Sequence, residues 1–390
     1  MSDSWRSDVV ISTILKHDRK VTSYKIALIR AINDVALSFP DLTETRQDVA
    51  IPLWMLAEWW IAYYWPFVAL EAPISQGPQP QSGSKLANDM AFRPTLTTLR
   101  RAWEIASGST SPPSEGFFVR SELRIPRRQS LYSPTILTAY GDALKDISKT
   151  LQMPIRYAGP AGEQWSIFPK PCRFAEIEEH AVAVPGTQPS DMCLLVTADL
   201  WRSFCRMAHW IEALCIHEWC LFTESLRPDS HYDRGSIFRL ITTRPENRRP
   251  MTWERHQIDL LLMEGVEFTC PWTEIPIRQS SDYDVDHLIP IAIYPTNELW
   301  NLIPSNPTFN QSIKRDRLPS TVALERARPQ IIAAYRRYDD TKLLHRAFHE
   351  DVALRFSPSA TSAGRFPDIV AASVINFVEQ IALARNSTRF

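Results

Sequence analysis

One segment of the chain collects side chains that suit the cleavage of a phosphodiester bond. It contains an acid beside a histidine, Asp286 and His287, and two asparagines further along, Asn301 and Asn310. Asp286 offers an anionic oxygen and Asn310 a neutral carbonyl oxygen, a pair suited to Mg²⁺ that keeps several waters, with Mn²⁺ as the alternative ion. An ion held by this pair would stabilise negative charge on the scissile phosphate and its leaving oxygen.

The other polar side chains of this segment have complementary uses. His287 has an ordinary pKa of about 6.5, so it can be neutral at working pH and take a proton from the attacking water as general base. Asn301 is expected to tie its loop with side chain to backbone hydrogen bonds and so to orient His287. A basic stretch follows, in which Lys314, Arg315 and Arg317 can contact flanking phosphates.

The elements around these residues must satisfy a geometric condition. Successive side chains of a strand point to opposite faces, so Asp286 and His287 can serve one site only at a strand end or a bulge, and Pro290 is consistent with an end there. In a regular strand Asp282 and Asp284 would share the face of Asp286. These two are expected to be solvated rather than to bind metal, because aspartate is mostly exposed.

The segment resembles the HNH nuclease motif, the ββα-metal fold, in its H-N-N variant. Asp286 and His287 match the acid and first histidine, Asn301 the middle asparagine, and Asn310 the final position. The spacings of fourteen and twenty-three residues from His287 to the two asparagines are similar to those in the HNH domain of RNA-guided CRISPR effectors. The resemblance implies a ββα-metal nuclease domain at 250–325.

The flanks of the motif extend the resemblance over roughly 250–320. The basic tail 314–319, which ends in Leu-Pro, looks like the stretch that commonly follows the final motif position, and 268–276 looks like a first strand and turn. The chain departs from many relatives in one respect, because they carry two C-x-x-C knuckles for a structural zinc and only Cys270 is present. Such a domain must be held by its own core and its neighbours.

The resemblance implies a metal-dependent endonuclease that hydrolyses DNA, leaving a 5′-phosphate and a 3′-hydroxyl and cutting one strand per active site. RNA is the less favoured substrate. Accessory domains on HNH proteins suggest a restriction or antiphage defence system, with a homodimer or a defence-complex partner. The alternative is a catalytically silent protein that uses an HNH fold to bind nucleic acid or assemble a complex. The intact Asp286, His287, Asn301 and Asn310 argue against that alternative.

Composition limits how the chain can meet a polyanion. Forty-three basic residues against forty-four acidic ones leave a net charge of −1, so no field of the whole protein attracts nucleic acid. Between Lys314 and Arg328 five residues are basic and two acidic, so the attraction is focused there. Six cysteines without a C-x-x-C pair predict reduced thiols, and the N-terminus lacks the pattern of a secretory signal, so we expect a cytoplasmic protein.

The remaining chain predicts an α+β protein with three parts. These are a mostly helical targeting or regulatory region at 1–245 with a loop-rich insert around 74–135, the nuclease domain at 250–325, and C-terminal helices at 326–390. The boundary falls in the Pro-rich stretch 242–250. The aromatic stretch 51–70 contains Glu58 and Pro66, so it predicts a core helix of about 14 residues and no membrane span.

Two sets of side chains at helical spacing could ligate a metal. Cys205, His209 and Glu212 lie in one predicted long helix at 200–226, and His345, His349 and Glu350 lie in a charged helical stretch. For the first set a core helix with a hydrogen-bonded histidine is the favoured interpretation, because buried cysteine is common and a second ligand cluster is not evident. The same judgement applies to the second set.

Overall fold

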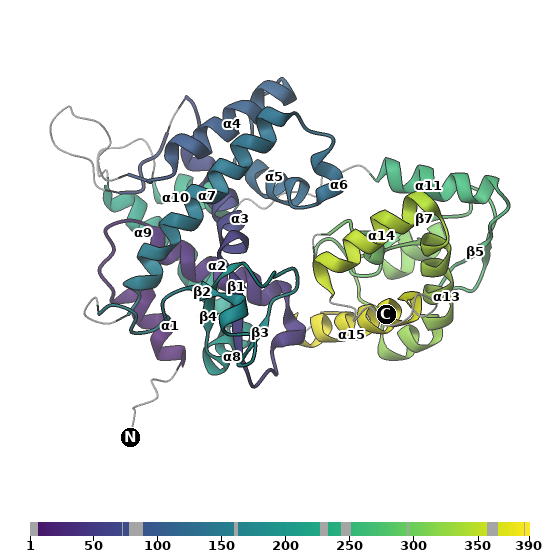
Figure 1. Cartoon of the computed structure of the whole chain (residues 1–390). Coiled ribbons are helices and arrows are strands. Elements are labelled where there is room, and N and C mark those ends of the chain that lie inside the picture. The colour runs from purple at the N-terminus through teal and green to yellow at the C-terminus, as the bar shows by residue number, and fades with distance from the viewer. Residues whose placement is uncertain are drawn as a thin grey trace. The chain divides into compact units, whose positions relative to one another are not determined.

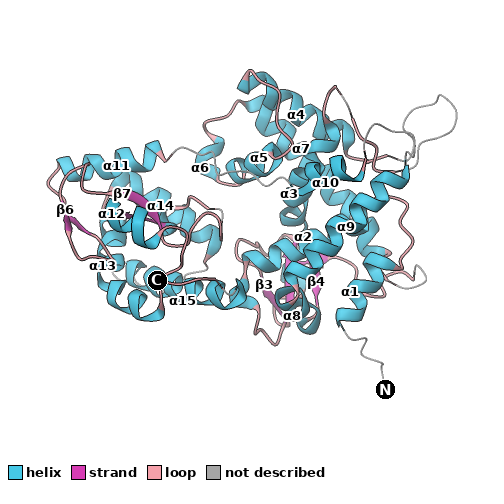
Figure 2. Ribbon diagram, turned by 180° about the vertical axis from the view of Figure 1, so that it is seen from behind, coloured by secondary structure: helices cyan, strands magenta, loops and turns pink. Residues whose placement is uncertain are grey.

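The computed structural model describes residues 7–71, 73–77, 89–159, 163–226, 233–242, 251–294, 296–356, 366–385 and 387–390. These residues belong to two compact units, Met1–Glu246 and Asn247–Phe390. Most of the predicted boundary, 243–250, and residues 78–88 of the predicted insert lie outside the described residues. Helices with small sheets form both units, so the predicted α+β class is confirmed (Figure 2).

The first unit combines helices with one four-stranded sheet (Figure 1). Its helices are α1 (Ser7–Lys16), α2 (Tyr24–Ser38), α3 (Leu53–Tyr64), α4 (Arg93–Ser107), α5 (Glu115–Leu123), α6 (Pro126–Gln129), α7 (Pro134–Arg156), α8 (Ala198–Arg206), α9 (Ala208–Leu226) and α10 (Arg234–Thr242). Its strands are β1 (Asp48–Pro52), β2 (Cys172–Arg173), β3 (Ala181–Ala183) and β4 (Met192–Val196). The strand order is β2-β4-β1-β3, with β1 parallel to β3 and antiparallel to β4.

The aromatic helix α3 lies in the core of this unit. It begins directly after Pro52 at the end of β1, and Trp65 opens a 3-10 turn in which Pro66 ends the helix. Trp60 and Tyr64 are fully buried, and α3 packs against α2, α5 and α7. The predicted core helix is therefore confirmed.

The described part of the predicted insert around 74–135 contains α4, α5 and α6, and Val119 and Leu123 of α5 are buried. One prediction for this unit needs correction. The single helix predicted at 200–226 is two helices, α8 and α9, since Met207 leaves helical geometry at φ −107° and ψ 15°. The break places Cys205 and His209 on different helices, and burial raises the pKa of the Cys205 thiol to about 11.

The described residues of the second unit contain two antiparallel strand pairs and five α-helices. The helices are α11 (Thr252–Met263), α12 (Pro307–Phe309), α13 (Thr321–Asp339), α14 (Lys342–Arg355) and α15 (Phe366–Arg385), with a 3-10 turn η5 (Leu299–Asn301) and a π-helical turn η6 (Asn310–Lys314). The strands are β5 (Phe268–Thr269), β6 (Pro276–Ile277), β7 (Asp284–His287) and β8 (Leu302–Ser305). Strands β5 and β6 pair antiparallel, as do β7 and β8.

One hydrophobic core runs through this unit. It includes Leu262 of α11, Trp300 beside β8, Tyr335 of α13, Phe348 of α14 and Phe377 of α15. The chain end closes the same structure, because the backbone nitrogen of Phe390 donates to the carbonyl of Leu318. A two-stranded hairpin alone is marginally stable in water. The helices predicted for 326–390 therefore supply the core on which the β7–β8 hairpin depends.

Among the described residues, one helix has the length and apolar composition to cross a membrane. This helix is α15, and half of its apolar window is buried inside the second unit. Val370, Val374 and Phe377 each belong to the core of that unit. Such burial is what a core helix shows.

Candidate active site

The β7–β8 hairpin and the helical turn after it form a ββα unit that positions the motif residues. The register pairs Asp286 with Ile303 and His287 with Leu302. Because alternate strand residues share a face, Asp284 and Asp286 both point toward the turn at 310–314. Asp284 Oδ2 accepts hydrogen bonds from Asn310 Nδ2 at 3.4 Å and from Gln311 Nε2 at 2.9 Å.

Asp286 is buried and held by two donors. Lys314 Nζ lies 2.6 Å from its Oδ1, and Trp272 Nε1 donates to its Oδ2 at 3.3 Å. The side chains of Lys314 and Asp286 are only 1% and 4% exposed, so this is an ion pair inside the protein. Lys314 Nζ also donates to the carbonyl of His287 at 2.6 Å. The ammonium group thus neutralises Asp286 and connects the turn to the end of β7.

The position of Lys314 differs from the prediction that it contacts phosphate. Residues four apart share one face of a helix, so Lys314 follows Asn310 to the side that meets β7. The backbone nitrogen of Arg315 donates to the carbonyl of Asn310, which makes a π-helical turn, and Arg315 ends it at φ +51°. Arg315 is exposed and Arg317 partly exposed, so these two can still meet a polyanion.

His287 lies at the end of β7 and is partly buried. Its Nε2 is 2.7 Å from Oδ1 of Asn297. An amide oxygen can only accept, so this contact places the proton on Nε2 and leaves Nδ1 as the accepting nitrogen. Burial lowers the pKa of His287, with Lys314 acting in the same direction, while Asn297 and Asp286 oppose the shift. The neutral imidazole, which a general base requires, is therefore favoured near neutral pH.

Asn301 is fully buried and ties the loop between the two strands. Its Oδ1 accepts from the nitrogen of Ile289 at 2.8 Å, and its Nδ2 donates to the carbonyls of Ile289 at 3.0 Å and Thr296 at 3.3 Å. The backbone of the same residue receives a hydrogen bond from Leu288. These contacts connect the stretch that follows His287 to the start of β8.

Three contributors to the site were missed at the level of sequence. Asn297 contacts His287 from an irregular loop, and Trp272 reaches Asp286 from the turn after β5. Asp351 of α14 is fully buried, and its Oδ2 accepts from the nitrogen of Leu299, where η5 begins, at 2.8 Å. The periodicity of strands or helices could not have indicated these contacts, because each joins segments that only the tertiary fold brings together.

The donor chemistry of the site fits a divalent cation that prefers oxygen. Asp284, Asp286 and Asn310 present carboxylate and amide oxygens near one face of the hairpin, and oxygen donors are what Mg²⁺ and Mn²⁺ favour. Asn310 directs its amide nitrogen to Asp284, which leaves its carbonyl oxygen as an acceptor. Asp286 already carries the ammonium group of Lys314. A cation that binds Asp286 must share that carboxylate with Lys314 or displace it.

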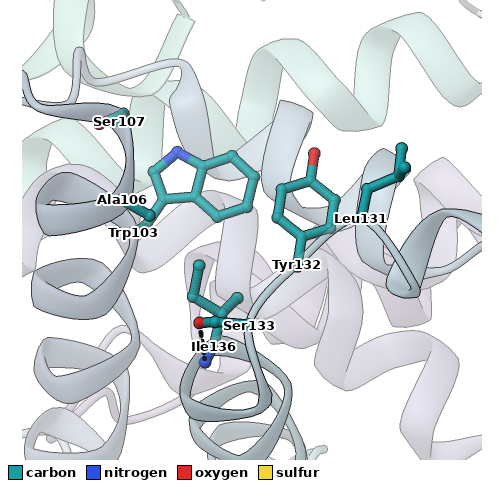
Figure 3. Close-up of a pocket in the computed structure, with 7 residues that line it drawn as sticks. All are labelled: Trp103, Ala106, Ser107, Leu131, Tyr132, Ser133 and Ile136. Carbon is teal, nitrogen blue, oxygen red and sulfur yellow. Dashed lines mark hydrogen bonds between the residues drawn. The ribbon is translucent and has the colours of Figure 1, made fainter.

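A separate pocket of about 240 Å³ lies in the first unit (Figure 3). Its lining is Trp103, Ala106, Ser107, Leu131, Tyr132, Ser133 and Ile136. The rings of Trp103 and Tyr132 stack with centroids 5.2 Å apart, and Ser133 Oγ accepts from the nitrogen of Ile136 as the N-cap of α7. This lining contains no carboxylate, imidazole or basic group, so it provides no acid and base pair for catalysis.

Comparison with known proteins identifies a family for each unit. Residues 6–241, more than half of the chain, match the family described as a domain of unknown function, DUF8808. Residues 270–320 match the HNH endonuclease family. No curated protein and no solved structure matches the chain. The chain therefore belongs to the DUF8808 family and carries in its C-terminal part a domain of the HNH endonuclease family.

Proposed function

We propose that the C-terminal unit is a divalent-metal-dependent endonuclease that hydrolyses phosphodiester bonds of DNA, one strand per active site. The observation that carries this proposal is the ββα arrangement of Asp286, His287 and Asn310 within a segment that matches the HNH endonuclease family. RNA is the alternative substrate. The oxygen donors around Asp286 support Mg²⁺, or Mn²⁺ in its place, as the ion.

His287 acts as the general base in this mechanism. Asn297 holds its Nε2, and its Nδ1 accepts a proton from the attacking water. The water oxygen forms a bond to phosphorus, the bond from phosphorus to the 3′ oxygen breaks, and the 3′ oxygen takes up a proton. An ion held by Asp286 and Asn310 would stabilise the negative charge that builds on the phosphate and the leaving oxygen.

The other site residues position this machinery. Asn301 holds the loop that follows His287, and the ammonium group of Lys314 holds the side chain of Asp286 in place inside the protein. Arg315 and Arg317 would contact phosphates that flank the cut, because both are accessible at the end of the turn. The helical first unit would select the target or regulate the nuclease.

A restriction or antiphage defence role, with a homodimer or a defence complex as the assembly, is the biological setting that we propose. The proposal of one active site per chain supports a homodimer or a larger complex, because a double-strand break would then need two subunits or two encounters. The six cysteines are free thiols, which supports a reducing cytoplasm as the location. Nuclease assays with and without a second copy of the chain would test the assembly.

The direct test uses full-length protein with supercoiled plasmid, single-stranded DNA and RNA, each with Mg²⁺, Mn²⁺ or EDTA. We expect metal-dependent nicking of the plasmid, abolished by EDTA and by His287→Ala. His256→Ala is the matched control, since His256 is an exposed histidine of α11 in the same unit. Nicking that His287→Ala leaves unchanged would contradict the assignment of the base.

A second candidate function is a silent HNH fold that binds nucleic acid or assembles a complex. The buried pair of Lys314 and Asp286 favours it, because an ammonium group already satisfies the carboxylate that a metal would need. Under this alternative Mg²⁺ would leave the unfolding temperature unchanged, and the protein would bind DNA without cutting it in any of the metals tested.

A further inference from the structure

We propose that Asp339, His345 and His349 form a zinc site at the junction of α13 and α14, separate from the oxygen-donor site of the β7–β8 hairpin. Asp339 is the last residue of α13, and the two histidines lie four residues apart on α14. Asp339 Oδ1 lies 2.9 Å from His345 Nδ1 and 2.7 Å from His349 Nε2. One ligand atom from each residue lies within 4.8 Å of the others.

The composition of the cluster selects the ion. Two imidazole nitrogens and one carboxylate are ligands that Zn²⁺ accepts in tetrahedral sites, whereas Mg²⁺ and Ca²⁺ prefer oxygen alone. A tetrahedral ion with bonds of about 2.0–2.2 Å needs ligand atoms roughly 3.3 Å apart. The observed separations from Asp339 require an opening of only a few tenths of an ångström, which side-chain rotation can supply. Water would complete the fourth position.

Neighbouring groups orient the ligands before an ion arrives. The ring of His349 stacks on Phe366 of α15 with centroids 3.8 Å apart and an angle of 7° between the planes. His345 Nδ1 also donates to the backbone carbonyl of Asp339 at 2.9 Å, so an ion must displace the proton on that nitrogen. The side chain of His345 is 52% exposed, so an ion can enter from solvent.

Electrostatics favour a cation at this position. The C-terminal end of a helix carries a partial negative charge, and Asp339 adds a carboxylate to the end of α13. Two arginines of these helices have carboxylates of their own, since Arg346 pairs with Glu350 at 2.9 Å and Arg336 with Asp368 at 3.1 Å. The structure thus replaces Glu350, the acid grouped with the histidines from sequence, by Asp339 from the preceding helix.

A zinc ion at this junction would fasten α14 to α13 and so stabilise the hairpin unit. Asp351, two residues beyond His349, binds the backbone nitrogen of Leu299, where the turn that carries Asn301 begins. By holding α14 in place, the ion would stabilise the turn that carries Asn301 without contacting a substrate. This inference is independent of nuclease activity, because it rests on the α13–α14 cluster alone.

The test measures zinc binding in tag-free full-length protein stripped with EDTA. An Asp284→Asn, Asn310→Ala background removes oxygen donors of the hairpin site and leaves the buried pair of Lys314 and Asp286 intact. Zinc that is lost when a residue of the junction is also replaced was therefore bound at α13 and α14. Into this background we introduce Asp339→Asn, His345→Ala or His349→Ala, with His256→Ala as the control. Isothermal titration with Zn²⁺ gives stoichiometry and affinity, and Co²⁺ substitution reports ligand geometry through its visible spectrum.

We expect one equivalent of zinc and a higher unfolding temperature in the background and in the His256→Ala control. Each ligand variant should weaken zinc binding at least about tenfold and lose the thermal shift. The Asp339→Asn variant keeps a side-chain oxygen that can accept hydrogen bonds from both histidines. If the three residues form only a hydrogen-bonded cluster, this variant should have the same metal-free stability and the same zinc affinity as the background protein. Equal zinc binding in every variant, or none in the background protein, would overturn the proposal. His345→Ala keeps the test valid if His349→Ala fails to fold, because His345 is half exposed.

Discussion

The two proposed cation sites of the second unit differ in ligand type and in burial. Around Asp286 the donors are oxygens, and Asp286 itself is buried and balanced by the ammonium group of Lys314. At the α13–α14 junction the donors are two imidazoles and one carboxylate, and His345 and His349 are open to solvent. The first site contains an ion pair buried inside the fold, whereas the second consists of two partly exposed histidines around one aspartate.

The two sites therefore differ in how strongly the stability of the fold depends on their side chains. A buried ion pair is costly to break, because the partner that remains is a charge without compensation. Partly exposed histidine and carboxylate contacts contribute little by themselves. Removal of a side chain should therefore affect the fold at the hairpin site, and ion binding alone at the junction.

The largest effect is expected for His287→Ala. Loss of a general base lowers a rate by about 10²–10⁴-fold, and His287 is the base in the proposed mechanism. Plasmid nicking in Mg²⁺ measures the rate, and circular dichroism confirms that the variant folds. If His287→Ala nicks plasmid at the rate of the His256→Ala control, His287 is not the general base of a catalytic centre at the hairpin.

Lys314→Met should cost about 3–5 kcal/mol of unfolding free energy in EDTA, because it leaves the Asp286 carboxylate buried without its partner. Urea denaturation measures the change, with Lys342→Met as the control, since Lys342 is exposed on α14. Millimolar Mg²⁺ should restore more stability to Lys314→Met than to the parent, since the ammonium group no longer competes for Asp286. An identical Mg²⁺ response in both proteins would show that the ion does not use Asp286.

Arg315→Gln and Arg317→Gln should weaken DNA binding evenly across sequences. Each phosphate contact that is lost should lower the slope of log affinity against log salt by about 1. Fluorescence anisotropy at several salt concentrations measures the slope, with Arg337→Gln on the exposed side of α13 as the control. Slopes that match the control would remove the two arginines from the DNA interface.

The smallest effect is expected for His345→Ala in metal-free protein. The side chain of His345 is 52% exposed, so its contact with Asp339 contributes little and the free energy of unfolding should change by less than about 1 kcal/mol. The zinc-dependent rise in unfolding temperature should disappear in the same variant. A large loss of stability without metal would instead show that the junction, like the hairpin site, depends on its own contacts.

The features that could be predicted from the sequence are those that depend on the spacing of residues within short segments. The helical nature of the first unit, the core helix at α3 and the membership of 270–320 in the HNH family follow from patterns within short segments. The break at Met207 could not be predicted, because 200–226 lacks proline and glycine and its apolar residues recur at helical intervals throughout. The inward position of Lys314 could have been predicted from its spacing of four residues from Asn310.

By itself, the sequence determined the residue types and their order along one ββα segment, Asp286 and His287 followed by Asn301 and Asn310. Strand alternation and helical spacing relate residues only a few positions apart, so they can predict the arrangement within this segment. Only the tertiary structure decided that Asn297 holds His287, that Asp351 supports η5, and that Asp339 joins the two histidines of α14. The reason is physical: these contacts depend on how the apolar faces of α13, α14 and α15 pack into one core, and that packing is set by the whole unit.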